Sequence, residues 1–384
     1  RGLGDGYKGQ ESVQPGTLTA EGTYYLRVQT QDNAGNWSDA ATVFTYKYDA
    51  TKPVNPTAAT CGDGKASGVW RNTSAPTFTL SGASDSTSGL KTTATQRYRY
   101  YLGTSSSGTP ATLDDETVQP ASLTTEGKYY LRVQTQDNAG NWSDTVTLFE
   151  YWYDGTKPVN PTAACSDGKA TGEWRNTSAP TFTLSGASDG AGSGLKTTAA
   201  ERYRYYWGTS DTGTPSAQDD EQVVPGALSA DGTYYLRVQT LDNAGNWSDA
   251  ATLFTYKYDA TPPAAAPAVS TTSNASGIIV NFTAGSDSGA NQSGLASAAY
   301  RVTRAAFGGF DSGPLASTAP AVDTEALTEL AEGDVAAYTI KTCDAAGNES
   351  TSTVTGRKTV SYTHLRAHET PEHLVCRLLL EKKK

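Results

Sequence analysis

The 384-residue sequence is acidic, with a formal net charge of −10, and it combines 22 Tyr and 38 Gly with three His and no Met. An acidic chain of this kind binds nucleic acid and anionic membranes poorly, so we expect no nucleic-acid partner and no membrane insertion. All three His lie within the last 25 residues. The rest of the chain therefore lacks the usual base of a catalytic triad, and we predict that the protein is not an enzyme.

One stretch recurs along the chain. YYLRVQTQDNAGNWSD at residues 24–39 returns unchanged at 129–144 and with one substitution at 234–249, and a divergent copy ends in DAAGN at 344–348. Alternation in the first half predicts a half-buried strand, DNAGN predicts a turn, and alternation over residues 43–48 predicts a second strand. The copies are spaced by 105, 105 and 102 residues. This period matches one small domain rather than a solenoid unit.

The period predicts a truncated repeat at 1–49, complete repeats at 50–154 and 155–259, and a divergent repeat at 260–359. The truncated first copy and the absence of Met lead us to expect an internal fragment. Residues 360–384 match no repeat. Their sequence, beginning VSYTHLRAHET, resembles a translated sequencing adapter, and we expect this tail to contribute nothing to the fold.

The second repeat shows the expected elements in order. A Pro-containing linker at 51–56 leads into strands predicted near 77–80, 97–101, 114–123, 129–136 and 147–153. About seven short strands separated by turns are typical of a β-sandwich. Alternation places eight side chains inside it, namely Phe78, Leu80, Tyr98, Tyr100, Leu131, Val133, Phe149 and Tyr151.

LTAEGTYYLRV at 18–28 resembles the corner between the fifth and sixth strands of fibronectin type III and related immunoglobulin-like domains. The resemblance implies that the Tyr24 hydroxyl bonds to the upstream backbone. DNAGN followed by YDATKP at 48–53 resembles tandem bacterial immunoglobulin-like repeats of large surface or secreted proteins. The resemblance covers residues 13–358 and implies an all-β fold of tandem immunoglobulin-like (fibronectin III-like) β-sandwich domains in an extended array. The fourth copy departs from it, with Ala336 at the corner position and Tyr338 in place of Leu.

Cysteine and tryptophan recur as parts of this scaffold. The three Cys before the tail fall in different repeats, which predicts semi-buried thiols and no disulfide within a domain. Trp residues follow the turn or precede the second strand of a repeat, and packing at the core or sheet edge is the expected role. A platform for glycan stacking is the alternative. These residues are Cys61, Cys165, Cys343, Trp37, Trp70, Trp142, Trp174 and Trp247.

Aspartate recurs where one repeat should meet the next. In an immunoglobulin-like fold, the end of one domain approaches the loops at the top of its successor. This placement predicts three sets of carboxylates: Asp49, Asp85 and Asp137; Asp154, Asp189 and Asp242; and Asp259, Asp287 and Asp344. Three carboxylates could hold Ca²⁺, which takes oxygen ligands. In the alternative interpretation each Asp caps its own turn. Calcium at these junctions is the one cofactor that the sequence suggests.

Two functions fit these features. In the first, the repeats form a monomeric, rod-like spacer or stalk of a bacterial cell-surface or secreted protein such as an adhesin. In the second, they are accessory modules of a secreted hydrolase and bind an extracellular glycan or protein. The near-identity of the copies favours the first, because a spacer needs no unique site. Both functions imply an extracellular or cell-surface location.

Overall fold

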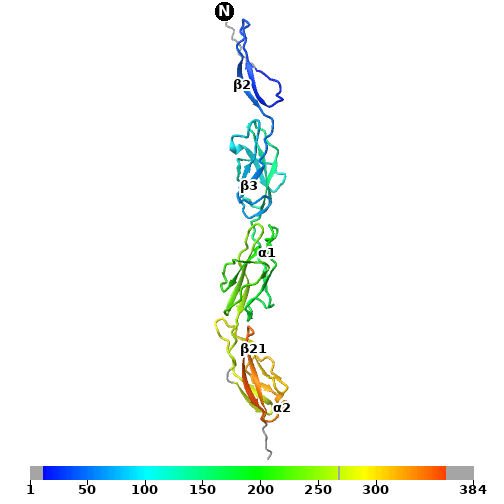
Figure 1. The fold of residues 1–384 in the computed structure, drawn as a ribbon, viewed down its shortest axis with the longest axis vertical. Helices are drawn as coiled ribbons and strands as arrows, with labels where there is room; N and C mark the ends of the chain where they lie inside the picture. The colour runs from blue at the N-terminus through cyan, green and yellow to red at the C-terminus, as the bar shows by residue number, and fades with distance from the viewer. Residues whose placement is uncertain (1–11, 267–268, 360–384) are drawn as a thin grey trace, which may run out of the picture. The chain divides into compact units, whose positions relative to one another are not determined.

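A computed structural model describes residues 12–266 and 269–359 of the chain (Figure 1). Two compact units are present. The first holds the described residues up to Asn160 together with Gly186–Tyr203 and Gln239–Asp249. The second holds Pro161–Ser185, Arg204–Val238 and the described residues from Ala250 onward. The predicted adapter-like tail, residues 360–384, lies outside the described residues.

The second repeat, in the first unit, contains two sheets. One has the order β3-β5-β8, formed by Ala58–Cys61, Phe78–Ser81 and Thr117–Val118. The other has the order β4-β10-β9-β6-β7, formed by Trp70–Arg71, Val146–Tyr153, Gly127–Thr135, Tyr98–Gly103 and Thr112–Asp114. The pairing is antiparallel except between β4 and β10. With β4 set aside, this is the three-plus-four strand order of an immunoglobulin-like sandwich.

The core of this repeat contains the residues that alternation predicted. All eight predicted side chains are buried, and they form one cluster with Cys61, Val118 and Tyr129. Phe78 packs against the rings of Phe149 and Tyr151 at centroid distances of 5.3 and 6.0 Å, which joins the two sheets. Period-two placement was therefore sufficient to identify the inward face of each main strand.

The third repeat has the same order. Its sheets are β11-β13-β16, formed by Thr162–Cys165, Phe182–Ser185 and Gln222–Val223, and β12-β18-β17-β14-β15, formed by Trp174–Arg175, Ala251–Tyr258, Gly232–Thr240, Tyr203–Gly208 and Ala217–Asp219. The two-residue strands β4 and β12 are a correction to the sequence-based prediction, in which their Trp simply preceded a strand.

Seven strands are present in the described residues of the fourth repeat. One sheet is β19-β20-β23, formed by Ser270–Asn274, Gly277–Asn281 and Ala321–Asp323. The other is β22-β21-β24-β25, formed by Phe310–Asp311, Leu295–Arg304, Val335–Asp344 and Glu349–Arg357. The helices of the described residues are single turns, η1 (Ala94–Gln96), α1 (Ala199–Arg202) and α2 (Ala326–Glu329). The protein is therefore all-β, with immunoglobulin-like, fibronectin III-like sandwiches repeated in tandem.

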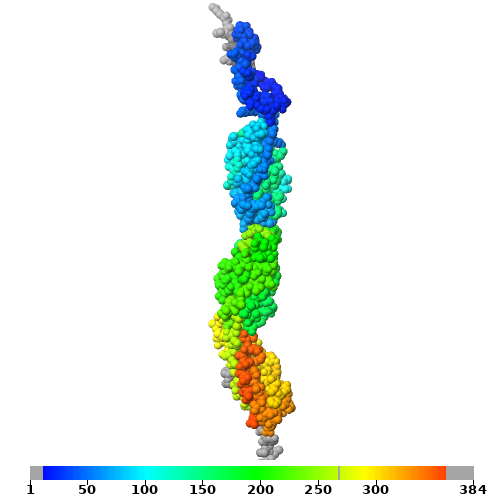
Figure 2. All heavy atoms as spheres, viewed as in Figure 1, coloured from blue at the N-terminus to red at the C-terminus, as the bar shows by residue number. Residues whose placement is uncertain are grey.

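The first repeat is a single hairpin in the described residues. β1 (Gly22–Val28) pairs with β2 (Ala41–Tyr48) in antiparallel register, and the two form a two-stranded sheet. The space-filling view shows this segment in dark blue (Figure 2). The predicted boundaries between repeats remain a prediction.

The tyrosine corner is present in the first three repeats. Tyr24 donates its hydroxyl hydrogen to the Ala20 carbonyl at 2.5 Å, and Tyr129 and Tyr234 make the equivalent bond at 2.5 and 2.8 Å. In the fourth repeat, Tyr338 instead donates to the buried Asp323 carboxylate at 2.7 Å. The departure noted in the sequence thus marks a different polar arrangement in that core.

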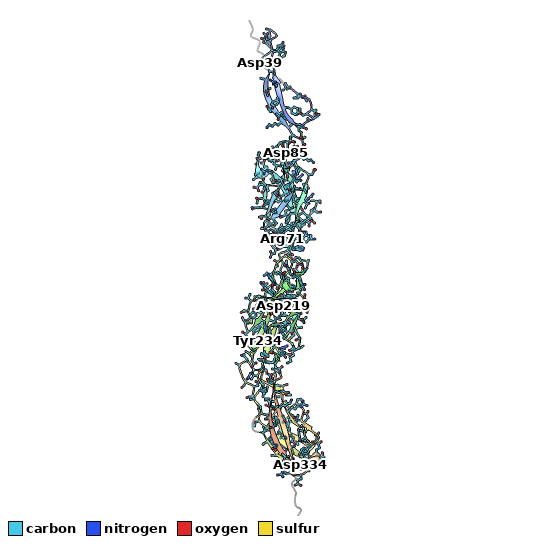
Figure 3. The ribbon with its side chains drawn as sticks, in the orientation of Figure 1. Asp39, Arg71, Asp85, Asp219, Tyr234 and Asp334 are labelled. Atoms are coloured by element: carbon cyan, nitrogen blue, oxygen red, sulfur yellow. The ribbon has the colours of Figure 1, made fainter. Side chains whose placement is uncertain are left out.

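A buried arginine lies in each complete repeat. Arg71 (labelled in Figure 3) donates from Nε to Asp63 at 2.8 Å, and its guanidinium carbon lies 5.2 and 5.0 Å from the ring centres of Phe149 and Tyr151. Its remaining donors bond to three carbonyls of one turn, those of Lys65, Ala66 and Val69. Arg175 repeats this set in the third repeat, and Arg304 is held by different carboxylates in the fourth. Each of the three guanidinium nitrogens of Arg71 thus has at least one acceptor, which makes its burial tolerable.

Candidate metal-binding aspartate clusters

The structure brings the nine predicted aspartates together as three groups. Within each group, one carboxylate oxygen per residue lies within 4.8 Å of the others. One member follows the last strand of a repeat, one lies in a loop of the next repeat, and one lies at the end of the long strand of that repeat or two residues beyond it. Asp85, the loop member of the first group, is labelled in Figure 3. We call the groups cluster 1 (Asp49, Asp85, Asp137), cluster 2 (Asp154, Asp189, Asp242) and cluster 3 (Asp259, Asp287, Asp344).

The strand-end member is fixed by the DNAGN turn. Asp242 Oδ1 accepts hydrogen bonds from the backbone N–H groups of Gly245 and Asn246 at 2.6 and 2.7 Å, and Asn246 Nδ2 donates to its Oδ2 at 2.8 Å. Gly245 has φ of +106°, a conformation that favours glycine. Asp137 and Asp344 make the same bonds. The turn-capping interpretation is therefore correct for these residues, and it does not by itself exclude a metal.

The linker member is held by the loop of the following repeat in clusters 2 and 3. Asp154 Oδ2 accepts a hydrogen bond from the backbone N–H of Ser193 at 2.6 Å, and Asn246 Nδ2 donates to the Asp154 carbonyl at 3.0 Å. Asp259 and Ser293 repeat the first bond at 2.7 Å. Hydrogen bonds within the protein are thus sufficient to orient the linker carboxylate toward this loop.

The loop member carries an unusual oxygen. Asp189 is 8% exposed, and its Oδ2 accepts a hydrogen bond from the Gly194 N–H at 2.7 Å. Its Oδ1 is buried and has no hydrogen-bond partner among the described residues. A side chain at Gly192 would lie only 2.8 Å from an Asp154 oxygen and 2.9 Å from an Asp189 oxygen, which shows how closely the loop encloses the carboxylates. Asp287 Oδ1 in cluster 3 is buried and without a partner in the same way.

Cluster 1 uses a shorter loop and leaves a different oxygen free. Ser88 follows Asp85 by three positions, whereas Ser193 follows Asp189 by four. The Ser88 N–H consequently donates to Asp85 itself, at 2.8 Å, and Asp49 Oδ2 is the buried oxygen without a partner in the described structure. Each cluster therefore contains one buried, unsatisfied carboxylate oxygen, although the residue that provides it changes.

The electrostatics of the clusters differ from those of an isolated turn. Burial, followed by the charges of Asp154 and Asp242, raises the pKa of Asp189 above its usual value. Burial also raises the pKa of Asp242 and of Asp287. Asp32 occupies the same DNAGN turn but stands outside the three clusters, and the hydrogen bonds from Asn36 lower its pKa. In the same local motif the pKa is thus raised at Asp242, where burial and then the charge of Asp154 disfavour the carboxylate, and lowered at the exposed Asp32.

A second set of hydrogen bonds joins the linkers that precede the second and third repeats to those repeats. Asn55 Oδ1 accepts hydrogen bonds from Thr135 and Ser143 at 3.0 and 2.6 Å, and its Nδ2 donates to the Asp144 carbonyl at 2.5 Å. Asn160 makes the same three contacts in the third repeat. Sequence reasoning missed this set, although the recurrence of Asn between two Pro in the linkers was a usable signal.

The fourth repeat lacks this fastening. Ala265 stands where the other linkers have Asn. Ser350, which corresponds to Ser143, has a buried hydroxyl without a hydrogen-bond partner in the described residues. Because Ala265 has no side-chain amide, the Ser350 hydroxyl lacks the acceptor that Asn55 provides for Ser143.

Several of the other residues singled out by sequence pack against neighbouring side chains, whereas Trp37 is 61% exposed. Arg99 stacks over Trp142 at 4.3 Å from the ring centre, and Trp152 lies between Trp70 and Lys128. Within the described chain the cysteines form no disulfide, with Cys61 and Cys165 buried and Cys343 partly exposed. No helix in this part of the chain is long and apolar enough to cross a membrane.

No protein-family model matches the sequence, and no curated protein does so either. Solved structures do show likeness. A tetra-tandem repeat from the extending region of a large adhesion protein is 15% identical, with 88% of this chain and 82% of that chain covered and a TM-score of 0.31. A Ca²⁺-stabilised, ice-binding adhesin of an Antarctic bacterium is 18% identical over the same shares, with a TM-score of 0.34. The fibronectin(III)-like modules of Clostridium thermocellum CbhA are 15% identical, covering 52% of this chain and 94% of theirs, with a TM-score of 0.30. The fold assignment rests on the strand order and register described above.

Proposed function

We propose that the chain is a series of non-catalytic structural repeats from a bacterial surface or secreted adhesin-like protein, and that each aspartate cluster binds one divalent cation, preferably Ca²⁺. The observation that carries the proposal is the buried carboxylate oxygen without a partner in every cluster, formed by Asp49, Asp189 or Asp287. Such an oxygen is costly unless a cation or proton satisfies it.

The chemistry of the clusters suits calcium. Each cluster gathers three carboxylates, and Ca²⁺ takes 6–8 oxygen ligands in flexible geometry. Mg²⁺ is smaller, needs near-octahedral ligands and dehydrates reluctantly, so it should bind more weakly. A bound ion would connect a linker carboxylate to two carboxylates of the next repeat, which supports a spacer whose linkers are stiffened by calcium.

The aromatic residues support the structural role over the alternative of a glycan-binding module. Arg99 stacks over Trp142, and Trp152 contacts both Trp70 and Lys128. Rings engaged in this way offer less open face for stacking on a sugar. The proposal also includes an extracellular location. It further includes an extracellular glycan or protein partner, bound by another part of the protein.

Calorimetric titration of the chelator-treated chain with CaCl₂ tests the proposal. We expect three sites per chain and a higher thermal midpoint, because an ion at about 100 times its Kd adds about 2.7 kcal/mol to the stability of the folded state. Asp189→Asn should remove one site. If the titration gives no heat of binding and neither calcium nor chelator changes the thermal midpoint, these Asp only cap turns.

The chain supplies a matched control. Asp242→Asn and Asp32→Asn alter the same DNAGN turn, but only Asp242 belongs to a cluster. Both variants should lose turn stability, while only Asp242→Asn should lose a calcium site. Equal calcium responses in the two variants would count against the cluster as the binding site.

A further inference from the structure

An acidic side chain lies three positions before the corner tyrosine in each of the first three repeats, at Glu21, Glu126 and Asp231. Its carboxylate accepts two hydrogen bonds from the linker that leaves the same repeat. Glu126 Oε1 accepts them from the Gly155 N–H at 3.0 Å and from the Thr156 hydroxyl at 2.5 Å. None of the three acidic residues belongs to an aspartate cluster. The contact therefore needs an explanation of its own.

The contact recurs although the acidic residue varies. Asp231 accepts the same two bonds from the Ala260 N–H and the Thr261 hydroxyl, at 2.7 and 2.5 Å. Glu21 accepts them from the linker after the first repeat, at 3.0 and 2.5 Å. The acidic residue is Glu twice and Asp once, so the bonds to the linker are retained with side chains of different length.

The threonine of each linker joins this contact to the cluster aspartate. The Thr156 N–H donates to Asp154 Oδ1 at 3.0 Å, and the Thr261 N–H donates to Asp259 Oδ1 at the same distance. Asp154 Oδ2 accepts its bond from the Ser193 N–H in the loop of the following repeat. One bond per oxygen leaves each carboxylate with further lone pairs for an ion. The linker carboxylate is thus held from the preceding repeat through threonine and from the following repeat through serine.

The contact is better suited to ordering the linker than to stabilising the fold. Glu126 and Thr156 are both exposed, so water competes for their hydrogen bonds and the net contribution to stability is small. Order in the linker has a different effect, because a ligand group that is already oriented loses less conformational entropy when it binds.

We infer that Glu126 and Asp231 are positioning residues of the cation sites. Each orders its linker so that Asp154 or Asp259 presents its carboxylate to the ion, and neither binds the ion itself. The inference rests on the proposed function, and it assigns part of the affinity of clusters 2 and 3 to the repeat that precedes each of them.

Hydrogen exchange measured over a range of CaCl₂ concentrations tests the inference at individual sites. Residues 189–195 and 287–295 have sequences that occur once in the chain, so their exchange reports on clusters 2 and 3 separately. Glu126→Ala should raise the calcium midpoint of residues 189–195 about tenfold, which corresponds to about 1.4 kcal/mol. The midpoint of residues 287–295 should stay unchanged. Asp231→Ala should give the reverse result, which makes each site the reference for the other.

Two further variants and one measurement separate positioning from a purely structural role. Thr156→Val removes the hydroxyl donor and keeps the N–H that bonds to Asp154, so it should raise the midpoint of residues 189–195 as well. Combined with Glu126→Ala it should add little, because both variants break the same bond. Glu126→Asp, which introduces the residue found at position 231, should preserve the midpoint. The thermal midpoint in chelator should be the same in all variants.

The possible failures are distinguishable. If the unmodified chain responds to calcium and neither Glu126→Ala nor Thr156→Val changes the midpoint of residues 189–195, the inference is overturned and the cation sites stand. It is also overturned if Glu126→Ala shifts both sites equally, or if it lowers the thermal midpoint in chelator as much as in calcium. Exchange that does not respond to calcium in the unmodified chain would overturn the proposed function, and the inference with it.

Discussion

The missing amide of the fourth linker can be restored by one substitution, Ala265→Asn. In the second and third repeats this position holds Asn55 and Asn160, whose side chains bond to the following repeat. Ala265 is partly exposed. The Ser350 hydroxyl, which should donate a hydrogen bond to the new amide oxygen, is buried and has no partner in the described structure. The substitution therefore adds an acceptor to an existing buried donor.

The magnitude follows from the bonds that Asn160 makes. Its Oδ1 accepts from Thr240 and Ser248 at 2.9 and 2.6 Å, and its Nδ2 donates to the Asp249 carbonyl at 2.7 Å. Each net bond contributes about 0.5–1.5 kcal/mol, so Asn160→Ala should lower the free energy of unfolding by about 2 kcal/mol. Ala265→Asn should raise it by about 1 kcal/mol, because ordering the new side chain offsets part of the gain.

Native-state hydrogen exchange is the suitable assay. The fourth repeat contains no Trp, so tryptophan fluorescence does not report on it, whereas β24 has a sequence that occurs once in the chain. A gain of about 1 kcal/mol slows exchange of its most protected amides about fivefold. Ala264→Asn, at the exposed neighbouring position, is the control and should leave the rate unchanged. Unchanged or faster exchange in Ala265→Asn would refute the assignment of Asn55 and Asn160 as linker fasteners.

Two other substitutions test the scaffold. Arg71→Met should lower the free energy of unfolding of the second repeat by about 3–5 kcal/mol, because it leaves Asp63 and three carbonyls without their donor. Chemical denaturation measures this loss. A loss below about 1 kcal/mol would mean that the aromatic packing alone stabilises this core. Tyr129→Phe should cost about 1 kcal/mol by removing the bond to Thr125, and Tyr24→Phe, whose bond to Ala20 is exposed, should cost less; equal losses would contradict a contribution from burial.

The sequence was sufficient for the main strands because their alternation is strong. Phe78, Leu80, Leu131 and Val133 lie on the inward faces that period two predicts. The strand β4 was not predicted, because two residues are too few to show an alternation. Its position depends on parallel pairing with β10. Local pattern alone could not supply that long-range contact.

The candidate sites were predictable in membership but not in detail. Topology was enough to group the nine aspartates, since the end of one repeat meets two loops of the next. The sequence could not predict which carboxylate oxygen lacks a hydrogen-bond partner in the described structure. This depends on the acceptor of one backbone N–H: Ser88 donates to Asp85 of its own loop, whereas Ser193 donates to Asp154 of the linker. Buried Arg71 was also missed, because a charged residue carries no signal of burial until its partners are known.

Every cluster draws its members from one linker and from the single repeat that follows it. A gene segment encoding 105 residues could therefore be duplicated or deleted by recombination between copies without creating an unmatched junction. Repeat number could thus change while the residues that meet at each junction stay the same.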